Sequence, residues 1–348
     1  MTLDVCVDEW WTNCVTDAPQ FTITPHLLTL VEQIAAVRER IQGASVELAW
    51  VPALQQESRS RNTHASTSIE GNPLTLKQVQ ALDAGRELAR ANGRAEREVT
   101  NYLAGLKYIE ARSDIEAVRH DDLFALHRIL AEGVMDQGDS GQYRTIFVTI
   151  GGDTPPGPHE VSPLMFELLD WWNKGSRELS PILSSAILHY RFEAIHPFAD
   201  GNGRTGRALA LWELYRRGFD THHIFSVDEY YWQDRPAYYD ALRATRQSGD
   251  LTGWLEYCAE GLRQTLESVW LRVQSLQPVS GEKLVLSSKQ QALLRLLVDH
   301  GGMGPSEIRE LMGMSKQGVM NLMNPLLDAG IVTKVGNHKT GRYQLTSR

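Results

Sequence analysis

Cysteine is scarce in this 348-residue chain, which contains only Cys6, Cys14 and Cys258. An odd number of cysteines without metal-ligand spacing argues against a disulfide scaffold and against a zinc module. The chain also lacks any run close to the roughly 20 apolar residues that span a bilayer, and its first nine residues include no basic residue to open a signal peptide. We therefore predict a cytoplasmic protein that makes no membrane contact.

The excess of one charge sign is small, because 35 lysine and arginine residues face 43 aspartate and glutamate residues, for a formal net charge of −8. This balance is not typical of a protein that coats nucleic acid with its whole surface. Hydrophobic residues make up 42% of the sequence and charged residues 22%, which provides for a large core and argues against disorder. The length is enough for roughly two or three domains.

Apolar residues recur at helical spacing through most of the chain before residue 277. Thr75, followed by Gln78, has the pattern of a capping box that opens a helix. We therefore predict a mainly α-helical protein. The helices are expected at residues 25–41, 75–88, 96–109, 121–130, 162–173, 181–195, 204–217, 235–246 and 251–276.

The pattern changes at 143–150 (YRTIFVTI), where isoleucine and valine alternate with threonine and phenylalanine before a pair of glycines. Alternation over a short run that ends in glycine predicts one arm of a β-hairpin. A Pro/Gly loop follows, after which Ser162 as N-cap and Pro163 as first helical residue predict the start of the next helix.

Residues 277–282 (QPVSGE) show no periodicity and predict a boundary, after which a new pattern begins. Three helices and a hairpin are expected beyond it, at 287–300, 305–312, 315–327 and 331–345. This order resembles that of the winged helix-turn-helix family. Residues 283–348 hold nine basic and four acidic residues. DNA binding through this segment is therefore one prediction, and protein docking is the alternative.

The densest chemical pattern lies at 196–207 (HPFADGNGRTGR), between two predicted helices. Its glycines allow successive backbone N–H groups to turn inward, and the next helix directs its positive N-terminus to the same place. Arg204 and Arg207 offer guanidinium groups that match phosphate geometry, while Asp200 offers the oxygen ligand that Mg²⁺ favours. Together these residues predict the binding of a nucleoside triphosphate with its metal ion.

Two other interpretations of this glycine-rich loop, a dinucleotide-binding loop and a Walker A loop, can be excluded. The dinucleotide pattern G-x-G-x-x-G requires a buried strand directly before the loop, whereas the residues before this loop have helical spacing. A Walker A loop needs Gly-Lys-Ser/Thr, which this loop lacks.

His196 directly precedes the residues that are predicted to bind an anion, and the ordinary pKa of histidine, about 6.5, suits a general base.

These twelve residues resemble the Fic family motif H-P-F-x-[DE]-G-N-[GK]-R-x-x-R, which they match at every fixed position. The resemblance extends over about 96–276. It implies a Fic-type helical core with a short β-hairpin flap, and Mg²⁺-dependent transfer of AMP from ATP to a Ser, Thr or Tyr hydroxyl of a protein. It implies that His196 is the catalytic base and that Asp200 holds the metal. The nucleotide contacts implied by the resemblance come from Gly201, Asn202, Gly203, Arg204, Thr205, Gly206 and Arg207 in the motif, from Tyr238 and Tyr239, and from Ile150, Gly151, Gly152 and Asp153 in the flap.

Gly203 distinguishes between chemistries of this family. The branch that resembles death-on-curing toxins has lysine at the corresponding position and transfers a γ-phosphoryl group, so glycine favours adenylyl transfer. Phosphocholine transfer, known from a rare relative, stays an alternative. The expected domains are an N-terminal helical region at 1–95, a catalytic core at 96–276 and a winged helix-turn-helix domain at 283–348.

Residues 66–72 (STSIEGN) resemble the inhibitory motif [ST]-x-x-x-E-[GN] of autoinhibited Fic proteins, with Ser66 and Glu70 at its first two fixed positions. The alternative is an ordinary helix end before a proline. A Glu70 carboxylate paired with Arg207 would remove a ligand of the γ-phosphate and place negative charge where more must enter. We therefore predict an inhibitory helix at about 58–70, before the catalytic core.

Two other activities stay open. Relatives use such a glutamate to orient water and remove AMP from modified proteins. A DNA-binding regulator that only senses nucleotide is the other alternative, although a sensor would not need the base His196. We also expect the strand edge at 145–150 to pair with an extended segment of a target protein. The target is not identified by the sequence, the chain itself is one expected acceptor, and homodimer formation is left open.

Overall fold

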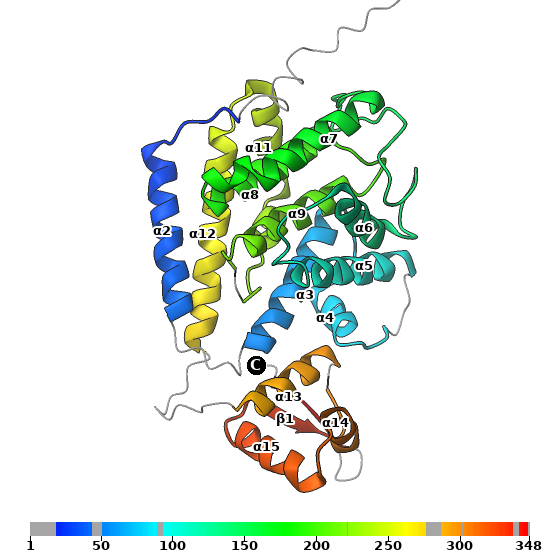
Figure 1. Ribbon diagram of the computed structural model, residues 1–348, viewed down its shortest axis with the longest axis vertical. Helices are drawn as coiled ribbons and strands as arrows, with labels where there is room; N and C mark the ends of the chain where they lie inside the picture. Colours follow the sequence, from blue (N-terminus) through cyan, green and yellow to red (C-terminus); the bar gives the residue numbers. More distant parts are fainter. Residues whose placement is uncertain are drawn as a thin grey trace, which may run out of the picture.

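The computed structural model describes residues 19–43, 51–88, 93–220, 222–275, 287–300, 302–336 and 341–346. Helices dominate these ranges (Figure 1), as the spacing predicts. The helices are α2 (Pro25–Gly43), α3 (Val51–Ile69), α4 (Leu76–Asp83), α5 (Gly93–Glu110), α6 (His120–Ala131), α7 (Pro158–Asn173), η1 (Gly175–Glu178), α8 (Pro181–Ile195), α9 (Asn202–Arg216), α10 (Asp228–Gln233), α11 (Arg235–Ser248), α12 (Thr252–Ser275), α13 (Ser288–Asp299), α14 (Pro305–Met312) and α15 (Lys316–Asp328). The strands of the described ranges, β1 (Val332–Val335) and β2 (Arg342–Leu345), form an antiparallel pair.

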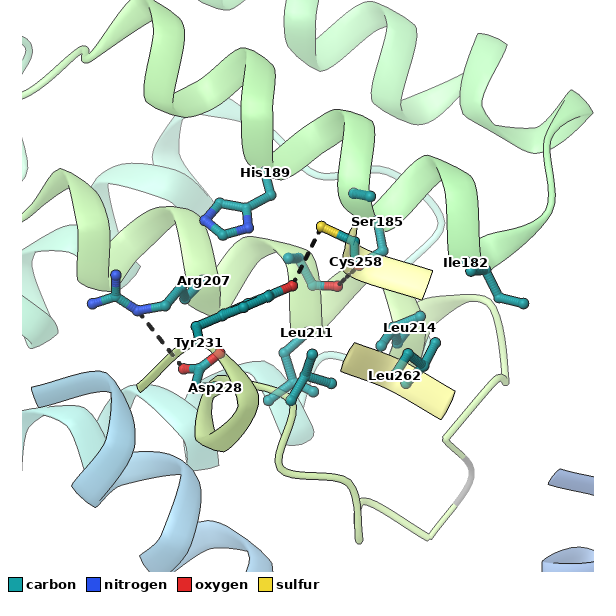
Figure 2. Close-up of a pocket in the computed structure, with 13 residues that line it drawn as sticks. Ile182, Ser185, His189, Arg207, Leu211, Leu214, Asp228, Tyr231, Cys258 and Leu262 are labelled. Atoms are coloured by element: carbon teal, nitrogen blue, oxygen red, sulfur yellow. Dashed lines mark hydrogen bonds and ion pairs between the residues drawn. The ribbon is translucent and has the colours of Figure 1, made fainter. Parts of the chain in front are cut away.

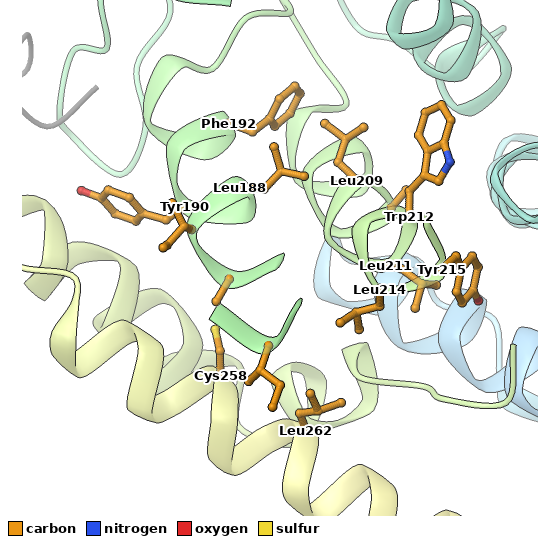
Figure 3. Packing of buried hydrophobic residues seen from close by; sticks show 14 of the residues in the cluster. Leu188, Tyr190, Phe192, Leu209, Leu211, Trp212, Leu214, Tyr215, Cys258 and Leu262 are labelled. Carbon is orange, nitrogen blue, oxygen red and sulfur yellow. The ribbon is translucent and has the colours of Figure 1, made fainter. Parts of the chain in front are cut away.

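Helices α8 and α9 form the centre of the larger part of the molecule and pack against each other. Every residue of α8 from Ile182 to Ile195 is buried, including the polar and charged residues Ser184, Ser185, His189, Arg191 and Glu193. Cys258 and Leu262 of α12 pack on this pair from one side (Figure 3). The loop that joins α8 and α9 therefore begins and ends at well-packed helices. This loop contains the predicted catalytic motif.

Helix α3 is mostly buried although it is rich in polar residues. Burial favours pairing of polar groups, and several side chains of this helix are paired. Arg59 Nε and Ser60 Oγ donate to the Asp83 carboxylate at 3.1 and 2.9 Å. Asn62 Oδ1 accepts the backbone N–H of Asp228 at 3.4 Å. The helix starts seven residues before the predicted 58 and is an integral part of the fold.

Helix α4 begins with the predicted capping box. The Thr75 N–H donates to Gln78 Oε1 at 2.9 Å, and the Gln78 N–H donates to Thr75 Oγ1 at 3.4 Å. The predicted end at 88 is wrong, because the helix stops at Asp83 and Gly85 takes a positive φ of 69°. Glycine in that conformation is a common helix terminator.

The β-hairpin predicted at 143–150 is wrong. Residues 143–149 form no strand, and the only pairing there is an isolated bridge between Ile150 and Asp153. Alternation misled the prediction because no face of the segment is buried: Ile146 and Phe147 are 41% and 72% exposed. Without a buried face, nothing selects a strand register.

The predicted start of α7 at Ser162 is also wrong. The helix begins at Pro158, because the Gly157 N–H donates to the Glu160 carboxylate at 2.6 Å and a proline at the first helical position loses no hydrogen bond. Pro163, predicted for that position, lies inside the helix.

Residues 287–346, here called the tail, have a hydrophobic cluster of their own, separate from that of the larger part. The three helices and the hairpin lie where they are predicted, and Ser315 caps α15 by accepting the Gly318 N–H at 3.1 Å. The predicted boundary at 277–282 lies outside the described residues. Helix α13 of the tail contacts α3 (Figure 1).

Candidate functional site

The loop between α8 and α9 is shaped by its two ends and by one side chain. His196 ends α8 in the left-handed region, at φ 51° and ψ 59°. Gly201 precedes α9 at φ 79°, which costs glycine little. The Asn202 side chain ties the loop together by accepting the Phe198 N–H at 2.9 Å and donating to the Phe198 carbonyl at 2.8 Å. The N-terminus of α9 is thereby directed at the loop, as an anion-binding site requires.

The glycines inside α9 make room for carboxylates. A side chain at Gly203 would collide with Glu70, and a side chain at Gly206 would collide with Glu193. Thr205, between them, is buried and donates its hydroxyl to the Gly201 carbonyl at 2.8 Å. The side chains of Asn202 and Thr205 thus maintain the shape of the loop, and their predicted role toward a nucleotide can come only from their backbone.

The Arg207 side chain is buried, with a relative exposure of 1%. It is held by Ser66 of α3 and by Glu70, just after this helix. Its Nε donates to Ser66 Oγ at 2.7 Å, and its Nη2 donates to the Ser66 carbonyl at 2.9 Å and to Glu70 Oε1 at 2.8 Å. Burial alone would raise the pKa of Glu70, but Arg207 outweighs it and keeps that pKa below its ordinary value. The predicted pairing of Glu70 with Arg207 is present in the structure, whereas the contact of Ser66 with Arg207 was not predicted.

A second carboxylate lies on the other side of Arg207. Asp228 Oδ2 is 3.8 Å from Arg207 Nε and accepts the Tyr102 hydroxyl at 3.1 Å. Behind these groups is an internal cavity of about 30 Å³, lined in part by His189 and Tyr231 (Figure 2). A space of this size holds no more than about two water molecules. It is therefore an interior void and not a nucleotide site.

Arg204 is also paired and nearly buried, with a side-chain exposure of 5%. Its Nη1 lies 2.7 Å from Glu98 Oε1, and its Nη2 lies 3.7 Å from Asp200 Oδ1. The other oxygen of Glu98 accepts the side-chain N–H of Asn72 at 2.7 Å. Glu98 thus joins the segment after α3 to one arginine of the motif.

Asp200, the predicted metal ligand, is fixed by backbone N–H groups. The Gly201 N–H donates to Oδ1 at 2.5 Å and the Asp136 N–H to Oδ2 at 3.0 Å. His127 holds the Asp200 carbonyl through Nε2 at 2.9 Å, while its Nδ1 accepts the Gly141 N–H at 2.8 Å. These two bonds fix the neutral tautomer of His127, and burial lowers its pKa to about 4.

His196 lies at the mouth of the loop with a side-chain exposure of 20%. Burial, opposed by the backbone of Glu193, lowers the pKa of His196 to about 4, with a further lowering from Arg144. Glu193 is buried one helical turn earlier, and burial raises its pKa to about 7. The imidazole is therefore neutral at physiological pH and free to accept a proton.

The flap, residues 143–158, is held to the loop by Arg144. Its Nε donates to the His196 carbonyl at 2.8 Å, while Nη1 and Nη2 donate to the carbonyls of Ile146 and Pro156 at 3.1 and 2.5 Å. Its backbone N–H donates to the Pro197 carbonyl at 2.9 Å. Side-chain hydrogen bonds thus replace the strand ladder that the sequence predicts.

The tip of the flap is held by α11. Arg246 Nη1 donates to Asp153 Oδ2 at 2.6 Å and to the Ile150 carbonyl at 3.5 Å. Between them, Gly151 and Gly152 take positive φ angles of 58° and 98° and are exposed. The contact of Gly151 and Gly152 with a nucleotide remains a prediction.

The two predicted tyrosines of α11 lie in different places. Tyr238 is buried in the core, where its hydroxyl meets His189 Nε2 at 3.1 Å and its ring stacks on Tyr231. This position behind Arg207 does not fit the predicted role as a surface contact for nucleotide. Tyr239 is half-buried with the Arg235 guanidinium over its ring at 5.3 Å, so its nucleotide contact stays a prediction.

Four residues that meet at the site were not predicted from the sequence. Arg144, Glu98 and Asp228 reach it from segments far from the motif, so no local pattern marks them. Glu193 is the exception, because it lies three residues before His196 in a helix and must share its face.

The described structure defines a class: a helical protein with an anion-binding loop at a helix N-terminus, two arginines directed at it and a neutral histidine beside it. Residues 117–214 match the model of the Fic/DOC family.

Several named relatives are similar over most of this chain. Proteins called protein adenylyltransferase Fic are 29% identical over 255 residues in Culex quinquefasciatus and 30% identical over 250 residues in Drosophila grimshawi. Each alignment covers 71% of this chain, but 49% and 50% of the relative. The chain thus spans about half the length of these relatives.

Solved structures have the same fold. A Fic family protein from Desulfovibrio desulfuricans G20 matches 95% of this chain and 99% of its own, with a TM-score of 0.65 and 28% identity. Fic-1 (residues 134–508) from C. elegans matches 72% of this chain and 74% of its own, with a TM-score of 0.63 and 23% identity. The first match includes most of the tail. In the described ranges, no helix has the length and apolar character needed to cross a membrane.

Proposed function

We propose that this protein transfers AMP from ATP to a hydroxyl group of a protein, itself included, and that Glu70 holds it in an inhibited state. The observation that carries the proposal is the 2.8 Å contact between Glu70 and Arg207, at a loop with every fixed residue of the Fic motif. Relatives named protein adenylyltransferase Fic support the reaction.

In this proposal the N-terminus of α9 and Arg204 bind the phosphates, and His196 acts on the acceptor. The acceptor hydroxyl gives its proton to His196 Nε2 and attacks the α-phosphate. The bond to the β-phosphate breaks, and pyrophosphate leaves. A neutral imidazole at physiological pH, which its lowered pKa supports, is the form that a general base requires.

Asp200 is suited to hold Mg²⁺. In the described ranges, no three side chains of His, Cys, Asp or Glu converge as a complete metal site. Mg²⁺ often takes one protein carboxylate and completes its shell with phosphates and water. The metal would neutralise charge on the phosphates, while the backbone N–H groups of Gly201 and Asp136 keep the carboxylate oriented.

Inhibition follows from competition for Arg207. A γ-phosphate and Glu70 are both anions that need the same guanidinium, and Glu70 is already bound to it. Gly203 leaves the space that the Glu70 carboxylate fills. ATP must therefore displace Glu70 before its phosphates reach a productive position.

Removal of AMP is the second candidate activity. The Glu70 side chain is 32% exposed, so it can also contact water. A carboxylate that orients water for attack on an AMP ester would use the same loop in the reverse sense.

The test is Glu70→Gly, assayed for self-modification with ATP and Mg²⁺ by intact-mass measurement. A coupling of about 1 to 3 kcal/mol corresponds to a rise of roughly 5- to 150-fold in transfer. Glu70→Gln, which keeps the shape but loses the charge, should rise less. Adding His196→Ala to Glu70→Gly should abolish transfer while ATP binding persists.

Equal rates for wild type and Glu70→Gly at saturating ATP would contradict the inhibition. An AMP-modified protein that loses AMP with wild type but not with Glu70→Gly would favour removal as the main activity. Replacing Arg207 as well should cancel the gain, because both changes then act on one contact.

A further inference from the structure

We propose that Glu193 is a positioning residue for His196, orienting its imidazole through Nδ1 and balancing the positive charge that forms when Nε2 takes the proton. The inference rests on the proposed transfer of AMP and adds a second group to its base. Nothing in the Fic motif itself includes this glutamate, which precedes the motif by three residues.

The geometry brings the two side chains together. Glu193 and His196 lie one turn apart at the end of α8, with Glu193 Oε2 3.8 Å from His196 Nδ1. Their side chains are 12% and 20% exposed. In the described part of the chain, neither Glu193 Oε1 nor His196 Nδ1 has a hydrogen-bond partner. A small rotation of either side chain would close the distance to a hydrogen bond.

A buried carboxyl oxygen without a hydrogen-bond partner, such as Glu193 Oε1, is costly, so its presence calls for a reason. The fold makes room for it, because Gly206 of α9 faces the carboxyl group and any larger residue there would collide with it. Leucine or methionine would fill this space without a polar atom to satisfy. The site thus keeps a group that is unfavourable for packing beside the residue that performs the chemistry.

A carboxylate beside Nδ1 has two effects on a histidine base. It favours the tautomer with the proton on Nδ1, which leaves Nε2 as the acceptor. After Nε2 has taken the hydroxyl proton, the carboxylate stabilises the imidazolium. The backbone of Glu193 acts in the same direction, since it also raises the pKa of His196.

The proposal predicts a pH dependence, set by the charged groups around the pair. Four charged groups face one or both members, namely Glu70 just after α3, Arg144 of the flap, Arg246 of α11 and Arg207 of α9. Burial raises the pKa of Glu193 to about 7, with Arg207 and Arg246 opposing and Glu70 adding to the shift. As the pH rises through 7, Glu193 becomes charged and strengthens its neighbour as a base.

Tyr238 of α11 also faces Glu193, and its hydroxyl stays neutral through this range because burial raises its pKa well above the ordinary value. We therefore assign the expected rise in kcat near pH 7 to the ionisation of Glu193.

The experiment compares Glu70→Gly with Glu70→Gly/Glu193→Gln in full-length protein. Loss of the carboxylate should lower kcat by about 10- to 100-fold, the range for a group that orients a ligand or base. KM for ATP should stay within about twofold, because the phosphates do not contact this group. The rise in kcat through pH 7 should disappear, and Glu193→Asp should restore part of it.

Glu213→Gln is the matched control, since Glu213 is a buried carboxyl group of α9 bound to Trp172 and Ser184. It should change stability without changing the pH profile. An unchanged kcat and pH profile in Glu70→Gly/Glu193→Gln would overturn the inference, whereas absence of transfer in Glu70→Gly itself would overturn the proposed function.

A second measurement needs no variant. Nitrogen NMR of histidine-labelled protein should show His196 protonated on Nδ1 at pH 8. Protonation on Nε2 instead would overturn the inference, whatever the activity of the variants.

Discussion

At the scale of single residues, two glycines shape the site as much as its charged side chains do. Gly203 and Gly206 lie on the first turns of α9, and each faces a carboxyl group that a larger residue would displace. In the proposed function, the glycines that would let backbone N–H groups approach phosphate thus also leave room for Glu70 and Glu193.

Glu193→Gln should stabilise the protein at alkaline pH although it lowers activity. The pKa of Glu193 is raised from its ordinary 4.5 to about 7, so the folded state holds this proton more tightly than the unfolded state. The stabilising contribution is complete below pH 4.5 and is lost as the pH rises to 7. Glutamine resembles the protonated form at every pH and carries no such loss.

The measurement is the free energy of unfolding of both proteins between pH 5 and 9. The difference in favour of the variant should grow toward pH 7 and then level off, at about 1 to 3 kcal/mol. A difference that does not change with pH would mean that Glu193 keeps its ordinary pKa in the folded protein.

At the scale of elements, two arginines hold the flap, Arg246 at its tip and Arg144 at its base. Arg144 donates to the carbonyls of His196, Ile146 and Pro156, and it is buried. A shift of the flap at Arg144 would therefore disturb the backbone of His196, the proposed catalytic base.

Arg144→Gln should lower transfer at least about tenfold in the Glu70→Gly protein and destabilise it by about 1 to 3 kcal/mol, because several buried carbonyls lose their donor. Protease cleavage within 143–158 should become faster. Arg243→Gln is the control, since Arg243 is exposed and binds only Asp240 nearby. Equal cleavage of the two variants would show that Arg144 does not hold the flap.

Most of the longer helices could be predicted because their sequences carry local signals of helical period and capping, whereas the short helices α10 and η1 were not predicted. The capping box at Thr75, the N-cap Ser315 and the apolar stripe of α5 are confirmed. The flap could not be predicted, since its shape depends on carbonyls that Arg144 collects from distant segments.

The same distinction applies to the site. The loop residues could be found because the motif is contiguous, and Glu70 because it belongs to a second short motif. Glu98 and Asp228 could not, because their partners Arg204 and Arg207 come close only after the helices pack. Tyr238 is buried, and the sequence pattern could not show whether this side chain lies in the core or at the surface.

At the scale of the whole molecule, the described residues form three hydrophobic clusters, and the tail contains one that shares no residue with the other two. We propose that the tail docks a partner and takes no part in the chemistry. Its hairpin is poorly disposed for DNA, because Arg342 already binds the Gly302 carbonyl and Glu307. A salt-sensitive shift of duplex DNA by the isolated tail would reverse this preference.

Deletion of residues 283–348 should leave the larger part folded, with cooperative unfolding and self-modification retained in the Glu70→Gly form. The reason is that its core contains no residue of the tail. The check is thermal unfolding together with the mass assay. An insoluble product, or one that has lost transfer, would show that the contact of α13 with α3 is needed for folding.

The burial of α3 would set how quickly the proposed inhibition by Glu70 is relieved. Arg59, Ser60, Asn62 and Ser66 fix the helix to three partners, Asp83, Asp228 and Arg207, so moving the helix aside would require local unfolding, a process of microseconds to seconds. Glu70 lies just beyond the last helical residue and is partly exposed, and an exposed side chain changes rotamer within picoseconds to nanoseconds. Relief by rotation of this one side chain would then follow the arrival of ATP almost at once, without any delay from the helix that carries it.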